Sequence, residues 1–367
     1  MHLKHKTSWA AGVVLGALFT FAQPGFAQLT DEEFNRFLQI SDSEQEDVWS
    51  RHFRVGALVG FNFKAEFSMN GTFRFSQNNP GPAGSGGVDR VYDDGYVKVD
   101  ASGNFGNETW NWGYQNSTQY TNSTQQLHFH AAQDYTASGS SDVNSDAQVG
   151  FELAYGGHLS RWGRALVGWE FGFGYLPINI EDNRTFTGVS ATRISHSFDA
   201  SGIEIPDAPY NGTFTGPGAL ISDFALPGLG DSFTNSLSLT GGRSLDVTLY
   251  SFRLGPTLHW ELFPRLAVAV SAGAAIGVLT GDLEFNESVL FPDGSTAVNV
   301  GSHSSTEITY GGYLSATVMY HVEEHGDFYL GVQYMPLSDA TFSGAGREAT
   351  LDMTGAVYVS FGINWPF

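Results

Sequence analysis

The last eleven residues alternate between apolar side chains and small or polar ones, up to a terminal aromatic residue. The apolar positions are Val357, Val359, Phe361, Ile363, Trp365 and Phe367, separated by Tyr358, Ser360, Gly362, Asn364 and Pro366. Successive side chains of a β-strand point to opposite faces, so this pattern predicts a strand with one apolar face. A strand of this kind that ends in an aromatic residue is typical of a sheet whose outer face meets lipid.

The same alternation recurs in seven earlier segments, at 55–67, 149–155, 167–175, 252–262, 266–278, 308–320 and 328–334. Three connections are short, at 160–163, 263–265 and 323–327. The other four are long, at 68–146, 177–246, 280–305 and 338–354. Short turns on one side and long extracellular loops on the other are the arrangement of bacterial outer-membrane barrels. We therefore predict an all-β, transmembrane, up-and-down antiparallel β-barrel over residues 53–367.

Aromatic residues gather at both predicted ends of these strands. Those at the short-turn end are Trp162, Trp260, Phe263, Tyr320, Phe328, Trp365 and Phe367. Those at the long-loop end are Phe63, Phe67, Tyr175, Tyr310 and Tyr334. Two aromatic girdles are expected of a barrel that crosses a bilayer, whereas a secreted β-sandwich has no use for them.

The strand count depends on two further segments. Residues 109–120 carry Trp110, Trp112 and Tyr114 on alternate positions, and residues 126–131 carry Leu127 and Phe129. Counting both as strands gives ten. The Asn, Gln, Ser and Thr residues among the aromatics favour a β-hairpin inside the first long loop, so eight strands is the prediction.

The N-terminus has the pattern of a secretory signal peptide over residues 1–27. Lys4 and Lys6 precede an apolar stretch at 9–22, and Gly25 to Ala27 provides a small-x-small cleavage site. Residues 28–52 then predict a short periplasmic helical segment, because Thr30 and Glu33 form a capping box. The chain has no cysteine, so an exported protein of this kind has no disulfides to stabilise it.

With its signal peptide and the terminal pattern of Ile363, Trp365 and Phe367, the chain resembles the small outer-membrane β-barrels of Gram-negative bacteria, OmpA-like and porin-like proteins. The resemblance covers the strands and the ending. It implies an outer-membrane location, contact with outer-membrane lipids, and an assembly signal for the outer-membrane assembly machinery formed by Val359, Phe361, Ile363, Trp365 and Phe367. Pro366 departs from the family pattern, since proline has no N–H to donate.

Charge limits the partners of the protein. The formal net charge is −21, which makes nucleic acid and anionic surfaces unsuitable partners. Charged residues are 15% of the chain, against about 25% in ordinary soluble domains.

The predicted inward faces of the strands carry a set of charged and titratable residues. They are Arg54, Lys64, Glu66, Glu152, Arg164, Glu170, Arg253, His259, Glu261 and His321. The interior of an eight-stranded barrel is just wide enough for side chains, so these groups must pair across the lumen. Such pairing favours a structural network over a gated solute path.

Three other chemical readings are weaker. His259, Glu261 and His321 lie near the periplasmic end, away from external substrates, and no Ser, His and Asp constellation stands out at the outer rim, so we expect no enzyme. Asp89, Asp93, Asp94 and Asp100 are calcium candidates without the EF-hand order. His128 and His130 alternate on one face but lack a third metal ligand.

The sequence therefore predicts a barrel with a structural or surface-interaction role, without cofactor or metal, whose surface ligand it does not identify. A small porin or channel is the alternative, favoured by ten strands or an open lumen, and a barrel enzyme is a third reading.

Overall fold

The computed structural model describes residues 51–367 except 76–77, 164, 229 and 323–325. The predicted signal peptide and helical segment lie outside the described residues, apart from Arg51 and His52. No helix in the described part of the chain is long and apolar enough to cross a membrane.

Eight antiparallel strands close into a ring, here called the barrel. They are β1 (Arg51–Phe61), β9 (Gln148–Trp162), β10 (Ala165–Asp182), β15 (Asp231–Phe263), β16 (Leu266–Leu290), β17 (Thr296–Val322), β18 (Gly326–Tyr334) and β21 (Val357–Pro366). Each strand pairs with the next of these in chain order, and β21 returns to β1. The up-and-down topology with eight strands is thus confirmed, and the three short turns lie at one end.

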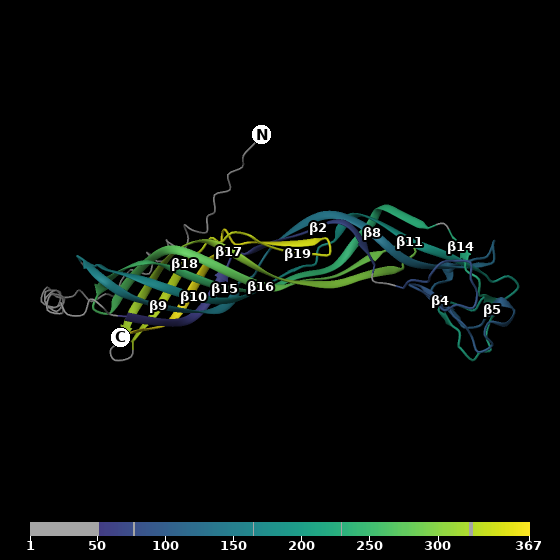
Figure 1. The fold of residues 1–367 in the computed structure, drawn as a ribbon, viewed down its shortest axis with the longest axis horizontal. Helices are drawn as coiled ribbons and strands as arrows, with labels where there is room; N and C mark the ends of the chain where they lie inside the picture. The colour runs from purple at the N-terminus through teal and green to yellow at the C-terminus, as the bar shows by residue number, and fades with distance from the viewer. Residues whose placement is uncertain (1–50, 76–77, 164, 229, 323–325) are drawn as a thin grey trace, which may run out of the picture. The chain divides into compact units, whose positions relative to one another are not determined.

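Strands β15, β16 and β17 run for 33, 25 and 27 residues and continue beyond the barrel (Figure 1). Their extensions join five further strands, β2 (Lys64–Arg74), β8 (Gln126–Asn144), β11 (Phe186–Asp199), β19 (Ala340–Gly344) and β20 (Arg347–Asp352). The order runs from β15 through β11, β8, β2 and β20 to β19. These five strands, with residues 231–249, 279–290 and 296–307, are here called the column. The predicted long loops therefore consist largely of strands.

The boundary between barrel and column is marked by paired rows of outward side chains. In one row Tyr175 pairs with Tyr250, Tyr250 with Val278, and Val278 with Ile308. In the next outward row Thr248 pairs with Thr280, which pairs with Thr306. Apolar residues face outward on the barrel side of this boundary.

On the column side the apolar residues face inward instead. Leu245, Val247 and Leu249 of β15 and Leu279 and Leu283 of β16 are at most 3% exposed. Each of these strands thus continues without interruption from a barrel with an apolar exterior into a column with an apolar core.

Between β1 and β2 the apolar side chains also change from the outer to the inner face, but here the strand itself is interrupted. Asn62 has a left-handed φ of 65°, which ends β1 at Phe61 and starts β2 at Lys64. After the break, Phe63 and Phe67 are buried at 0% and 1% exposure. Their predicted place in an aromatic girdle is therefore wrong, whereas Tyr310 and Tyr334 are exposed as expected.

Beyond the column, short strands form a small unit here called the cap, residues 78–125 and 200–228. It contains β3 (Arg90–Tyr92), β4 (Gly95–Val97), β5 (Glu108–Thr109), β6 (Trp112–Tyr114), β7 (Tyr120–Thr121), β12 (Tyr210–Asn211), β13 (Ile221–Ser222) and β14 (Leu226–Pro227). Strand β6 pairs with β4 and β12, while β8 belongs to the column. The predicted hairpin between 109–120 and 126–131 is therefore reduced to its end, where Tyr120 of β7 pairs with Leu127 of β8, and Trp112 and Tyr114 take no part in it.

Buried apolar side chains form three clusters along the molecule. The first, which includes Phe63, Leu176 and Tyr358, lies where the barrel meets the column. The second fills the column around Tyr135 and Phe291, and the third packs Trp112 and other cap residues against Phe129 of β8 and Phe198 of β11.

Candidate functional site

The centre of the barrel lumen holds two carboxylates and two guanidinium groups, here called the lumen network. Arg54 Nη2 lies 2.7 Å from Glu170 Oε1, on β1 and β10. Arg253 of β15 lies 2.9 Å from Glu152 of β9 and 3.4 Å from Glu170. All four side chains are 6% exposed or less. The two positive and two negative charges balance, which a buried set requires.

Neutral groups complete this network. Tyr329 Oη donates to Glu152 at 3.0 Å, and Arg253 donates to Gln333 at 2.5 Å. Gly172 is needed beside them, because a Cβ atom there would lie 2.4 Å from Arg253 Nε. Together these side chains reach into the lumen from β1, β9, β10, β15 and β18.

Of the ten predicted lumen residues, the structure brings Arg54, Glu152, Glu170 and Arg253 together. Lys64, Glu66, Glu261 and His321 are exposed instead. The break at Asn62 moves Lys64 and Glu66 to the outer face. Glu261 lies at the exposed short-turn end, where His321 pairs with Asp327 at 2.7 Å. Arg164 lies outside the described residues.

The remaining predicted residue, His259, belongs to a layer of three histidines at the short-turn end of the lumen. Its ring centroid lies 5.3 Å from that of His158, which lies 6.0 Å from that of His52. His52 Nε2 is 3.7 Å from Glu170. His52 and His158 did not emerge from the sequence, although each continues the inward alternation of Arg54 or Glu152.

A second buried network crosses the column around Glu287, which is 0% exposed. Arg347 Nη2 donates to it at 2.6 Å, Arg243 Nε at 2.7 Å and Tyr135 Oη at 3.1 Å. Burial, followed by the charge of Glu287, raises the pKa of Tyr135 to about 12. These ties join β8, β15, β16 and β20 inside the column.

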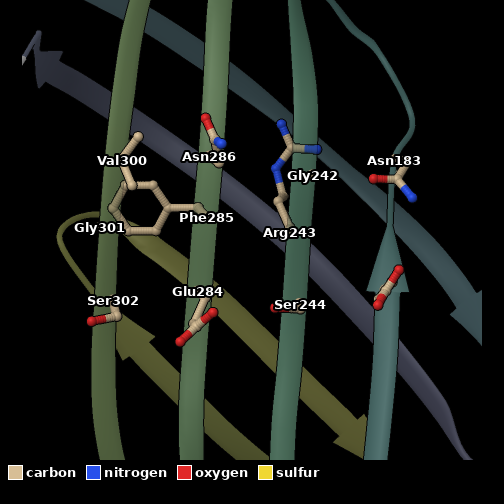
Figure 2. Close-up of a pocket in the computed structure, with 11 residues that line it drawn as sticks. Asn183, Gly242, Arg243, Ser244, Glu284, Phe285, Asn286, Val300, Gly301 and Ser302 are labelled. Carbon is tan, nitrogen blue, oxygen red and sulfur yellow. The ribbon is translucent and has the colours of Figure 1, made fainter.

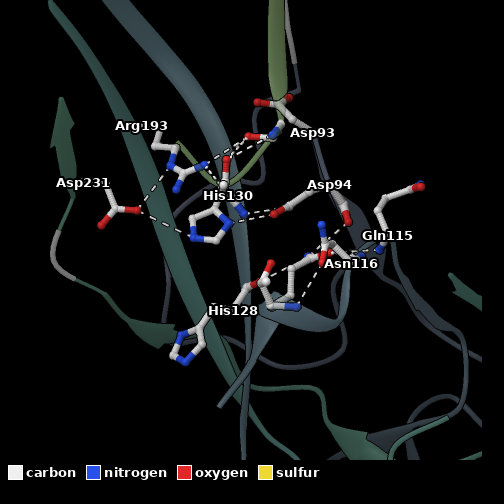
Figure 3. A network of polar contacts seen from close by, with 12 residues as sticks. Asp93, Asp94, Gln115, Asn116, His128, His130, Arg193 and Asp231 are labelled. Atoms are coloured by element: carbon white, nitrogen blue, oxygen red, sulfur yellow. Dashed lines mark hydrogen bonds and ion pairs between the residues drawn. The ribbon is translucent and has the colours of Figure 1, made fainter. Parts of the chain in front are cut away.

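A third polar cluster, here called the joint, connects cap and column (Figure 3). His130 Nδ1 lies 2.6 Å from Asp94, and its Nε2 lies 3.6 Å from Asp231. Arg193 contacts Asp231 at 3.2 Å and Asp293 at 2.7 Å. Its guanidinium also lies over the rings of Phe233 and Phe291, at 4.9 and 5.1 Å from their centroids.

The four calcium candidates are distributed over the cap, and the two histidine candidates lie on β8 of the column. Asp93 and Asp94 accept backbone hydrogen bonds from Ala132 and His130 at the joint. Asp89 accepts from Val99 N, and Asp100 from Ser102 N. His128 contacts Ser197 and Thr121 and not a carboxylate. Within the described residues, no three His, Asp or Glu side chains are arranged to hold a metal ion.

A hollow of about 550 Å³ lies on the outer face of the column (Figure 2). Its lining includes Glu181, Ser244, Glu284, Asn286 and Ser302. Arg243 also borders it, but its guanidinium is committed to Glu287 and Asp182. Phe285 and Val300 also line it, so the hollow combines two exposed carboxylates with apolar surface.

The residues of the predicted assembly signal lie on β21, which pairs with β1 and β18. Phe361, Trp365 and Phe367 are exposed at 53%, 44% and 69%. They belong to an outward apolar belt around the barrel that includes Phe53, Phe151, Phe171, Phe252, Leu254, Ile276, Ile308, Leu314 and Leu330. Recognition by an assembly machinery stays a prediction.

No family model matches the chain, and no curated protein matches its sequence. Its structure is similar to those of Gram-negative outer-membrane β-barrels. The outer-membrane protease OmpT of Escherichia coli matches with 8% identity and a TM-score of 0.33, over 87% of this chain and 97% of that one. OprG of Pseudomonas aeruginosa matches with 9% identity and a TM-score of 0.29, over 85% and 97%. Ail of Yersinia pestis matches with 9% identity and a TM-score of 0.25, over 86% and 99%.

Proposed function

We propose that this protein is a closed outer-membrane barrel that holds a rigid column and cap outside the membrane, for contact with another surface. The observation that carries the proposal is the continuation of β15, β16 and β17 from the barrel into the column. A strand needs about 9–11 residues to cross a bilayer. At about 3.3 Å per residue, the 33 residues of β15 extend for roughly 110 Å.

The change of apolar side along these strands supports the placement of the membrane. A belt of exposed Phe, Leu and Ile residues surrounds the barrel, and the three outward rows of β15, β16 and β17 next to it on the column side consist of Thr, Ser, Asp and Glu. Farther from the barrel the column exposes Leu290, Val298 and Val300 as well. An apolar exterior suits lipid, and an apolar interior with a polar exterior suits water. The column and cap are therefore assigned to the aqueous side at the end opposite the short turns, which is the cell exterior in the outer-membrane arrangement.

The lumen network argues for this role over that of a channel. Arg54 and Arg253 are held by carboxylates across the lumen, with Tyr329 and Gln333 beside them. The apolar cluster around Phe63, Leu176 and Tyr358 follows directly toward the column. An ion would have to displace a charge-balanced network and then enter an apolar core, and both steps are costly.

We assign no catalytic step to the chain. His130 at the joint has both ring nitrogens facing carboxylates, and these contacts tie the cap to the column.

Conductance of the purified full chain in planar bilayers tests the closed barrel. We expect background current, and discrete steps at low voltage would overturn the proposal in favour of a channel. The double variant Glu152→Ala/Arg253→Ala serves as the assay control, because it removes one buried pair and widens the lumen. Fractionation and heat-modifiable migration on unboiled gels test the location, and recovery in the soluble periplasm would contradict it.

A further inference from the structure

Three phenylalanines are exposed on adjoining segments of the cap. Phe105, Phe214 and Phe224 are 88%, 58% and 40% exposed. Backbone hydrogen bonds from Ala101 N to Phe214 O at 2.8 Å and from Asp223 N to Asn107 O at 3.0 Å place the three segments side by side. We call these three residues the apolar tip. Single exposed apolar residues are ordinary on protein surfaces, but a group of aromatics on neighbouring segments marks a contact site.

The turn that carries Phe105 is fixed before any partner binds. Asp100 Oδ1 accepts from Ser102 N at 2.8 Å and from Asn104 N at 3.3 Å. Ser102 Oγ accepts from Phe105 N at 3.2 Å. Asn104 has a left-handed φ of 58° and donates to Asp223 Oδ2 at 3.1 Å, next to Phe224. A preformed turn avoids the entropic cost of ordering a loop on binding.

The surroundings of the apolar tip are acidic. The cap contains eight carboxylates and two basic residues, Arg90 and Lys98, and Asp199 at the end of β11 directly precedes its second segment. The eight are Asp89, Asp93, Asp94, Asp100, Glu108, Glu204, Asp207 and Asp223. Arg90 is 1% exposed, so Lys98 is the basic group that solvent reaches. Five of the carboxylates, at positions 89, 108, 199, 204 and 207, are exposed. Such a surface attracts cations and repels a second copy of itself or an anionic membrane.

From these observations we propose that the apolar tip is a docking site for a protein surface that carries lysine or arginine around an apolar patch. Phe105 enters the apolar patch as the central anchor, flanked by Phe214 and Phe224, because aromatic anchors in desolvated pockets contribute most to such contacts. Exposed carboxylates such as Glu108, three residues from Phe105, pair with the partner's cations. A bilayer does not suit this site, since inserting the phenylalanines would also desolvate Glu108.

This inference deepens the proposed surface role, and its test uses the full chain in lipid nanodiscs. A library of random 12-residue peptides displayed on phage is selected against the chain, and enriched peptides are synthesised and measured by fluorescence anisotropy. We expect enrichment of lysine, arginine and apolar residues. Phe105→Ser should weaken binding at least tenfold. Raising the salt concentration from 50 to 500 mM should also weaken binding to the wild type, because salt screens the pairs between carboxylates and basic residues.

The matched control is Val300→Ser, which removes an apolar side chain 57% exposed on the column. It should leave binding unchanged. Phe105→Ser should keep heat-modifiable migration, because an 88% exposed side chain supports little of the fold. Peptides without basic residues, or equal effects of the two variants, would overturn the inference.

Two further outcomes distinguish protein docking at the apolar tip from lipid binding and from a contact at another place on the protein. Binding of phosphatidylcholine vesicles that is lost in Phe105→Ser would make the tip a lipid site and overturn protein docking there. Peptides that bind Phe105→Ser and Asp207→Asn as tightly as they bind the wild type would locate the contact away from the apolar tip. The surface role would then stand while the tip would not.

Discussion

Arg253 is the residue on which the closed lumen most depends. It contacts Glu152, Glu170 and Gln333, and it is 6% exposed. A buried pair adds little net stability over a well-packed apolar pair, but removal of one partner leaves the other charge uncompensated. Glu152 and Glu170 would then share the single charge of Arg54.

We therefore expect Arg253→Met to lower the free energy of unfolding by about 3–5 kcal/mol. Urea unfolding in detergent, followed by tryptophan fluorescence, measures this change. Lys64→Met, at an exposed site outside the network, is the matched control and should change the free energy by no more than about 0.5 kcal/mol. Adding Glu152→Gln to Arg253→Met should restore part of the loss. A simple addition of the two effects would count against the network.

Asp93 at the joint gives a prediction about pH. Burial raises the pKa of its carboxyl from 3.8 to about 6, against the lowering effect of the hydrogen bond from Ala132 N. The folded protein therefore binds this proton more tightly than the unfolded chain does. This contribution to stability is present at low pH and is lost as the pH rises from about 4 to about 6.

The measurement is the difference in free energy of unfolding between the wild type and Asp93→Asn, with Trp110 and Trp112 of the cap as fluorescent reporters. We expect this difference to shift against the wild type between pH 4 and pH 6, since asparagine does not titrate. Asp207→Asn, at an exposed site in the cap, provides the baseline. A difference that is constant over this range, or one that shifts the other way, contradicts the prediction.

At the scale of the strands, the alternation predicts the barrel well and the column poorly. The eight spans and three short turns follow from apolar side chains on every second position, because lipid demands one continuous apolar face. On the column side of Tyr250 the apolar residues of β15 occupy the alternate, inward-facing positions, at Leu249, Val247 and Leu245. From sequence this change is easily interpreted as the end of a strand, and so the column was assigned to loops.

The candidate sites divide in the same way. The alternation of side chains along unbroken strands correctly predicts four lumen residues, Arg54, Glu152, Glu170 and Arg253. It failed for Lys64 because the left-handed turn at Asn62 reverses the faces, and an asparagine in a sequence permits such a turn without requiring it. The joint could not be predicted, since Asp94, His130 and Asp231 come together through pairings between distant segments.

The boundary between barrel and column can be tested along β15. Leu254 and Thr248 both face outward on β15 and are six residues apart in the sequence. Leu254→Arg should cost about 2–4 kcal/mol, as expected for arginine facing lipid near the midplane, and Thr248→Arg about 0–1 kcal/mol. Equilibrium folding into vesicles measures both variants. Equal costs would mean that the lipid boundary does not lie between these two positions.

At the scale of the molecule, the two ends of the barrel are predicted to face different compartments. The chain has no cysteine, so a single introduced thiol reports its own location. Thr215→Cys in the cap should react with a membrane-impermeant maleimide in intact cells. Pro264→Cys, in the short turn between β15 and β16, should react after the outer membrane is permeabilised. Labelling of both in intact cells, or the reverse pattern, contradicts the assigned orientation.

The uninterrupted course of β15, β16 and β17 also determines how the molecule resists force. A pull on the cap is passed to β15, which begins at Asp231 just after the cap, and the hydrogen bonds of β15 to β10 and β16 run across the direction of load. The ladder is then strained in shear, so many of its bonds must fail together, whereas a hinged loop would allow them to peel apart singly. The proposed contact at the cap and the proposed membrane anchor in the barrel are thus joined by a strand that is suited to carry tension.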